Sequence, residues 1–103
     1  MDSIYSIGEI KRRLHPIFDT APVYRAILFG SYAKGSATEQ SDLDIVLESK
    51  GELRGLHFYG VLEDVVTALD KSIDMFEMSE IRPDSPLMDE INSWGVVLYE
   101  RQG

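Results

Sequence analysis

The segment from Val23 to Phe29 constrains the fold more than any other, because it is short, largely apolar and bounded by turn-forming residues. Ala21-Pro22 precedes this segment, and Gly30-Ser31 follows it. Such a run is typical of a buried strand that ends in a glycine turn. The chain must therefore build a sheet around this strand, and we expect a short helical turn to begin at Ser31.

A first helix is predicted upstream of this strand. Residues 6–9 read Ser-Ile-Gly-Glu, which has the form of a capping box. Apolar residues then follow at helical spacing, namely Ile7, Ile10, Leu14, Ile17 and Phe18. Pro16 lies inside this pattern and removes a backbone hydrogen-bond donor. We expect Pro16 to kink the helix or to end it near Leu14.

Downstream of the glycine turn, strand and helix patterns alternate. Residues 42–47, 72–77 and 96–99 are predicted strands, and residues 86–92 form a short helix that Pro86 can start. Residues 55–70 predict an amphipathic helix. Its apolar side is formed by Phe58, Tyr59, Val61, Leu62, Val65, Val66 and Leu69.

The length of 103 residues suits a single domain, which we expect to span residues 1–103. So short a chain can hardly supply two full helical layers. The alternation of helices and strands therefore predicts an α/β (α+β) sandwich, in which a small mixed sheet carries helices mainly on one face.

Gly30 and Ser31 have the chemistry of a phosphate-binding turn. Glycine allows a sharp turn after the strand and a close approach of a phosphate to the backbone. Amide groups at the start of the following helix would point at the anion, and Ser31 adds a hydroxyl donor.

Asp42 and Asp44 lie two residues apart on a predicted strand, so both carboxylates share one face. Hard oxygen ligands suit Mg²⁺ or Mn²⁺, which can neutralise a triphosphate while its α-phosphate is attacked. Taken alone, the two aspartates would also fit an exposed edge strand beside a Ser-Asp turn. Together with Gly30-Ser31, they indicate a site for a metal-bound nucleoside triphosphate.

A third carboxylate is needed to complete a two-metal site or to accept a proton from an attacking hydroxyl. We choose Asp74, because it stands in the middle of a predicted strand between Ile73 and Met75. Glu48 and Glu77 lie nearer to strand ends, and we expect both to be solvated.

The segments from Leu28 to Gly35 and from Ser41 to Ile45 resemble the signature of the minimal nucleotidyltransferase family, within the DNA polymerase β-like superfamily. The resemblance covers nearly the whole chain and implies that family's fold. It also implies transfer of a nucleoside monophosphate from a triphosphate, here ATP, to a hydroxyl. Asp42, Asp44 and Asp74 would then be the catalytic and metal-binding residues.

The same resemblance implies which residues bind the nucleotide. Gly30 and Ser31 would hold the phosphates, and Ser41, which precedes Asp42 in the motif, is assigned to the same group. Lys34 stands where many members of the family have arginine, so a phosphate contact there would lose bidentate geometry.

Many such minimal domains are antitoxins encoded beside a HEPN-domain toxin, and some adenylylate a tyrosine of that toxin. The resemblance therefore implies a HEPN-type protein partner. Two alternatives stay open: an adenylyltransferase that modifies the partner, or a binding module that neutralises it by occlusion. Transfer to a small molecule is disfavoured, since relatives with that activity carry an additional helical domain.

The formal net charge of −8 argues against direct binding of nucleic acid and suits a basic protein partner, although it also keeps a small domain soluble. The chain has no cysteine, which excludes thiolate metal sites and cysteine nucleophiles. No apolar run approaches the roughly 20 residues of a membrane span. We expect a cytoplasmic protein, alone or in a homo- or hetero-oligomer.

Overall fold

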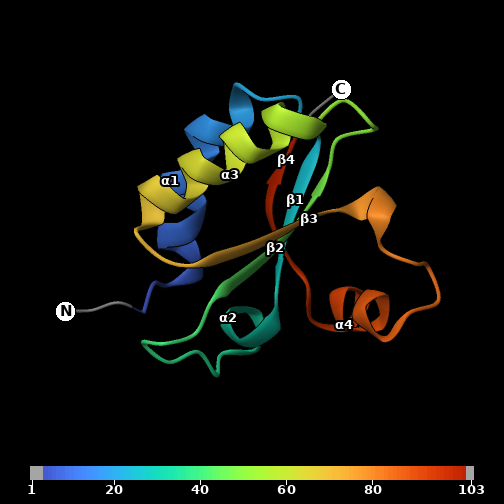
Figure 1. Cartoon of the computed structure of the whole chain (residues 1–103). Coiled ribbons are helices and arrows are strands. Elements are labelled where there is room, and N and C mark those ends of the chain that lie inside the picture. The colour runs from blue at the N-terminus through green and yellow to red at the C-terminus, as the bar shows by residue number, and fades with distance from the viewer. Residues whose placement is uncertain (1–3, 102–103) are drawn as a thin grey trace.

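In the computed structural model, which describes residues 4–101, the sheet has the strand order β3-β2-β1-β4. The strands are β1 (Arg25–Phe29), β2 (Leu43–Glu48), β3 (Ile73–Glu77) and β4 (Val96–Glu100). β1 lies antiparallel to both β2 and β4, whereas β2 and β3 are parallel (Figure 1). β3 and β4 are therefore the edge strands.

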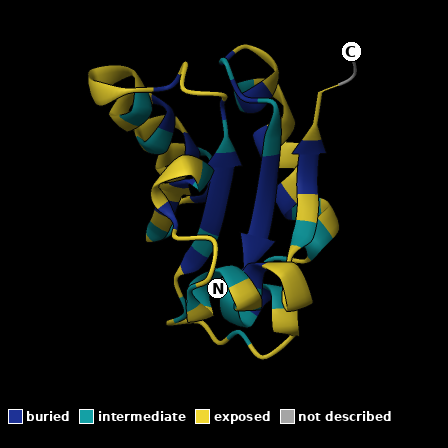
Figure 2. Cartoon of the chain, turned by 90° about the vertical axis from the view of Figure 1, so that its right-hand side faces the viewer, coloured by how far each residue is buried: buried dark blue, intermediate teal, exposed yellow. Residues whose placement is uncertain are grey.

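Helices cover the two faces of the sheet unequally. α1 (Ile7–Asp19) and α3 (Gly55–Leu69) lie over one face and enclose the larger part of the core (Figure 1). α4 (Pro86–Trp94) and the 3-10 helix η1 (Met78–Glu80) adjoin a smaller apolar cluster of Ile27, Phe29, Val46, Ile81 and Ile91. Figure 2 shows the strands as a buried layer between these elements. The predicted fold class is confirmed.

The C-terminal end of β1 lies beside the N-terminal ends of β2 and β3, at one end of the sheet; below, this end is called the site edge. β1 ends there at Phe29, which pairs with Asp44 near the start of β2. β3 begins at the same edge, because its first residue, Ile73, is the register partner of Leu43. α2 (Gly30–Lys34) follows β1 directly. The turn at Gly30 and the aspartates Asp44 of β2 and Asp74 of β3 therefore lie at the site edge.

α1 continues through Pro16 to Asp19, so the predicted end near Leu14 is wrong. Ser6 caps the helix as expected, since its hydroxyl oxygen accepts a hydrogen bond from the Glu9 amide at 3.1 Å. Proline removes one backbone hydrogen bond, but Pro16 lies on the exposed side of the helix, where water can solvate the carbonyl that loses its partner. The last turn also buries Phe18 completely, which favours continuation.

α3 has the expected amphipathic pattern with one correction. Val61, Val65 and Leu69 are buried, but Tyr59 is 64% exposed and Val66 is 37% exposed. These two residues lie outside the buried stripe of the helix, on the part of its surface that points away from the sheet. None of the helices within residues 4–101 has the length and apolar character needed to cross a bilayer.

Candidate active site

Gly30 begins α2 with a φ of +75°, a conformation that side chains other than glycine rarely adopt. A Cβ at this position would overlap Oδ2 of Asp44 and lie 3.0 Å from its Cγ. Glycine is therefore required for two separate reasons, the backbone turn and the space that the Asp44 carboxylate fills. The turn and the β2 strand form one continuous site.

Three aspartates gather at this edge of the sheet. Asp44 and Asp74 are register partners on the parallel strands β2 and β3, which places both side chains on the same face. Asp42 directly precedes β2 and is exposed, as is Asp74 on its edge strand, whereas Asp44 is half-buried. The structure thus places the three carboxylates that sequence reasoning selected at the same end of the sheet.

The crowding of negative charge at this edge affects Asp44 most. Burial raises the pKa of Asp44 to about 6, and the nearby charges of Asp74, Asp42 and Glu90 add to the rise. A group with this environment favours a proton or a cation next to it. Perturbed acids of this kind are common at functional sites.

The residues present fit a divalent cation by their chemistry. Carboxylate oxygens are hard ligands of the kind that Mg²⁺ and Mn²⁺ prefer, and a cation would relieve the repulsion that raises the pKa of Asp44. Among residues 4–101, no three carboxylate or imidazole side chains already lie close enough together to hold a metal ion. The aspartates would have to draw together around the ion.

Lys34, at the end of α2, faces α4 on one side of the site. Its Nζ lies 3.7 Å from Oε2 of Glu90 and 5.8 Å from the ring centroid of Trp94. Sequence reasoning missed Glu90, because its proximity to Lys34 and Asp44 depends on how α4 packs against α2. An acidic residue on a short helix gives no signal of that contact.

Ser41 has a clear structural role in the loop before β2. Its hydroxyl oxygen accepts a hydrogen bond from the Thr38 amide at 2.8 Å, and its own amide donates to the Thr38 carbonyl oxygen at 3.1 Å. These bonds close the turn that leads into Asp42. Ser41 therefore braces the loop, and nucleotide binding by Ser41 stays a proposal.

The prediction that Glu77 is solvated is wrong, because this residue is only 6% exposed. Its carboxylate accepts hydrogen bonds from the amide and hydroxyl of Ser49 and from the amide and hydroxyl of Ser79. These four donors explain how a charged group can be buried at the far end of the sheet. Glu48 is half-buried and forms an ion pair with Arg25 at 3.1 Å.

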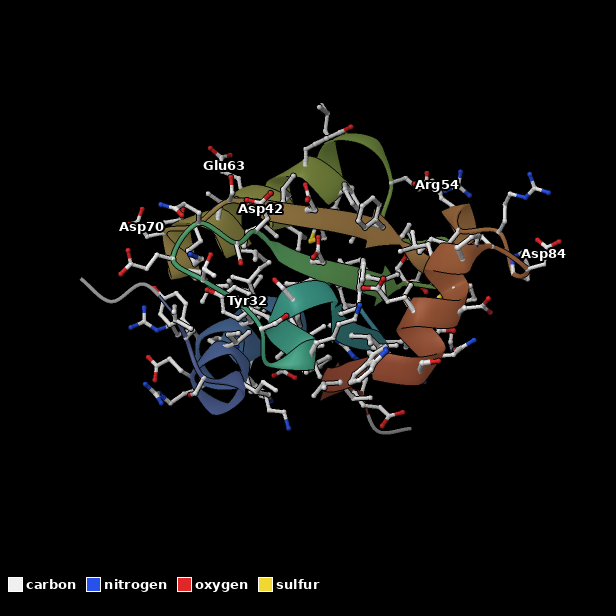
Figure 3. All side chains as sticks on the ribbon, turned by 90° about the horizontal axis from the view of Figure 1, so that it is seen from below. Tyr32, Asp42, Arg54, Glu63, Asp70 and Asp84 are labelled. Carbon is white, nitrogen blue, oxygen red and sulfur yellow. The ribbon has the colours of Figure 1, made fainter. Side chains whose placement is uncertain are left out.

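A hollow of about 680 Å³ opens beside Asp42, on the side of the site that faces α1 and α3. It is lined by the loop before β2, by the end of α3 and by part of α1, including Arg13, Ser41, Asp70 and Lys71. Figure 3, which looks at this end of the molecule, shows Asp42 and Asp70 on the same side. The hollow offers space for a group that approaches the aspartates.

Comparison with known sequences gives one family for most of the chain. Residues 12–103 match the family model described as "Polymerase beta, Nucleotidyltransferase". A protein of Methanocaldococcus jannaschii named "Putative protein adenylyltransferase MJ0435" is 35% identical over 78 residues, which cover 76% of this chain and 84% of the relative. A second protein of that organism, with the same description, is 45% identical over 49 residues, 47% of this chain and 49% of the relative.

Several solved structures with the same fold come from toxin-antitoxin complexes. One, described as a toxin-antitoxin with AMP-PNP, has a TM-score of 0.72 at 21% identity, over 95% of this chain and 76% of the other. Another contains a tri-AMPylated HEPN toxin of Shewanella oneidensis with an MNT antitoxin, and its TM-score is 0.68 at 17% identity, over 93% of this chain and 74% of the other. At these identities the likeness establishes the fold.

Proposed function

The chain belongs to the polymerase beta nucleotidyltransferase family and is a nucleotidyltransferase, and we propose that it transfers AMP from ATP to a hydroxyl group of a partner protein. The observation that carries this proposal is the convergence of the Gly30-Ser31 turn with Asp42, Asp44 and Asp74 at one sheet edge. The protein adenylyltransferase description of two relatives supports a protein as the acceptor.

In the proposed complex, Gly30 and Ser31 hold the triphosphate through the backbone of the turn and the serine hydroxyl. Asp42 and Asp44, with Asp74, hold Mg²⁺ or Mn²⁺, which supplies neutralising charge for the triphosphate when bound. Lys34 contributes a further positive charge if it exchanges its contact with Glu90 for a phosphate oxygen. These roles follow the chemistry of each group at the position where the fold puts it.

The reaction is a substitution at the α-phosphorus. The acceptor oxygen forms a bond to this phosphorus, the bond to the oxygen that leads to the β-phosphate breaks, and pyrophosphate leaves with the electron pair. The proton of the acceptor hydroxyl passes to a carboxylate, for which we assign Asp74 because it is exposed at the edge of the sheet. The chain thus binds ATP, orients its α-phosphate and accepts a proton.

We infer further that the acceptor is a HEPN-type toxin and that this chain acts as its antitoxin in the cytoplasm, where ATP is available. Support comes from the structural neighbours, in which an MNT antitoxin is found with a HEPN toxin that carries AMP groups. The net charge of −8 suits a basic partner.

The test is a labelling experiment in which the candidate acceptor is the protein encoded by the gene next to that of this chain. With ATP labelled at the α-phosphate and Mg²⁺, we expect label on the partner, and no label with Asp44→Asn or with EDTA. The Asp84→Asn variant, which changes an exposed acid on a different loop, is the control and should label fully. Equal labelling by wild type and Asp44→Asn would contradict the proposal.

Neutralisation by occlusion is the second candidate, and the acidic charge of the chain favours it. Both candidates require a complex, but only transfer requires the aspartates. If Asp42→Asn and Asp44→Asn together leave toxin neutralisation in cells intact, occlusion replaces transfer as the function. If neutralisation disappears while the complex still forms, transfer is retained.

A further inference from the structure

The exposed side of α3 is unusual for a surface helix, since it carries large apolar side chains that are mostly open to solvent. Leu56 is 89% exposed and Tyr59 is 64% exposed. We define the outer face of α3 by Leu56, Tyr59, Gly60, Glu63, Asp64 and Val66. Exposed apolar groups of this size that adjoin one another on a helix are typical of a contact surface.

Gly60 lies in the middle of this outer face and is not explained by the fold. Glycine inside a helix costs about 1 kcal/mol relative to alanine. A Cβ at residue 60 would meet nothing within 4 Å, so no neighbouring part of the described chain requires the missing side chain. A glycine at this position lets another backbone approach the helix closely.

The acidic side chains on the same helix are all exposed to solvent. Residues 55–70 contain no lysine or arginine, and Glu63, Asp64 and Asp70 are exposed. Asp70 caps the C-terminus of α3 in the left-handed conformation with a φ of +52°. The positive group that the helix dipole favours at this end is Arg13 of α1, which donates a hydrogen bond to the carbonyl oxygen of Ala68 at 3.2 Å. Glu63 and Asp64, by contrast, form no ion pair with a described residue, so basic groups of a partner would complement them.

The outer face leads to the side of the candidate site where Asp42 lies. α3 ends at Leu69 and Asp70, which line the hollow of about 680 Å³ that also contains Asp42. Figure 3 shows Glu63, Asp70 and Asp42 on one side of the molecule, with Arg54 toward its opposite end. A segment that lies along α3 therefore reaches the hollow beside Asp42.

We propose that the outer face of α3 is the docking surface for the acceptor protein, and that the docked segment is basic with apolar side chains that cover Leu56 and Tyr59. The segment runs along the helix toward Asp70 and places the acceptor hydroxyl in the hollow beside Asp42. This inference rests on the proposed function, because it names where the proposed protein acceptor binds. The charge of α3 and the position of its C-terminal end select this occupant.

The test uses the full chain and the acceptor protein that the labelling experiment identifies, with affinity measured by titration calorimetry. Leu56→Ser and Tyr59→Ser should each weaken the complex at least about tenfold, which corresponds to about 1.4 kcal/mol of binding free energy. Glu63→Lys should weaken it as well, and the loss should shrink as salt is raised.

Matched controls separate docking from folding. Val97→Ser removes a 40% exposed apolar side chain on β4, the edge strand opposite to β3, and Asp84→Lys reverses an exposed acid outside α3. Both variants should bind the partner like wild type. All variants should bind AMP-PNP with unchanged affinity, because none of them alters the proposed nucleotide site.

The outcomes distinguish this inference from the function on which it rests. If wild type neither binds nor labels the partner, the proposed function fails. If wild type labels the partner, and Leu56→Ser or Tyr59→Ser binds the partner with the same affinity as wild type, the docking surface is elsewhere. If the isolated wild-type chain is a dimer and Leu56→Ser makes it a monomer, a second copy of the chain covers this face, and the inference is overturned.

Discussion

The carboxylate of Asp44 occupies the space that a side chain at residue 30 would need, so the observed position of Asp44 requires glycine at residue 30. This contact links the turn that we assign to the triphosphate with the strand that we assign to the metal. A change at either residue is therefore expected to disturb both parts of the site.

Gly30→Ala should destabilise the protein by about 2–4 kcal/mol and abolish ATP binding, because it combines a strained backbone with a steric overlap. Gly35→Ala is the matched control, since Gly35 has a φ of +80° but a Cβ added there would meet open space. It should cost about 1 kcal/mol, the backbone strain alone. Urea unfolding of both variants measures the difference, and equal losses would contradict the overlap.

The raised pKa of Asp44 predicts that the stability of the metal-free protein depends on pH. Its pKa rises from 3.8 to about 6 on folding, so the folded state binds more protons between these values. Its stabilising contribution is complete below pH 3.8 and is lost as the pH rises through about 6. Because the group is partly solvated, the loss should be about 1 kcal/mol.

Asp44→Asn removes this titration. In EDTA, the variant should be more stable than wild type at about pH 7.5 and lose that advantage at about pH 4, as measured by the free energy of unfolding in urea. Asp84→Asn, which changes an exposed acid, should show no such difference. A constant difference between Asp44→Asn and wild type at all pH values would refute the assignment.

Mg²⁺ should stabilise the wild-type protein, because the ion binds the folded state and neutralises the carboxylates that repel one another. We expect Tm to rise with Mg²⁺ concentration for wild type and to change little for the double variant Asp42→Asn and Asp44→Asn. EDTA-treated protein gives the reference Tm. A rise of the same size in the double variant would place the cation elsewhere.

Glu77→Ala should destabilise the protein by about 2–4 kcal/mol, since it leaves the amide and hydroxyl donors of Ser49 and Ser79 without their acceptor. Glu48→Ala is the matched control, because it removes a glutamate whose ion pair with Arg25 is solvated, and should cost less than about 1 kcal/mol. Similar losses in denaturant unfolding would mean that the hydrogen bonds of buried Glu77 contribute no more stability than the solvated ion pair of Glu48.

These two glutamates also show what the sequence could predict. Periodicity placed the helices and strands, and the two-residue spacing of Asp42 and Asp44 placed both carboxylates at one edge, because these signals are local. The environment of Glu77 depends on serines that follow two different strands, which no local pattern reveals. The same holds for Glu90, whose position near Asp44 requires α4 to pack against α2.

Glu90→Gln should strengthen ATP binding by about two- to fivefold, in the range expected for one partly solvated charge. Glu90 competes with a triphosphate in two ways, since it engages Lys34 at 3.7 Å and adds negative charge near Asp44. Asp89→Asn is the control, because Asp89 is an exposed neighbour on the same helix and has no ion-pair partner among the described residues. Calorimetric titration with AMP-PNP and Mg²⁺ at low salt measures both affinities. If the two variants change affinity equally, the effect reflects net charge, and Glu90 does not restrain Lys34.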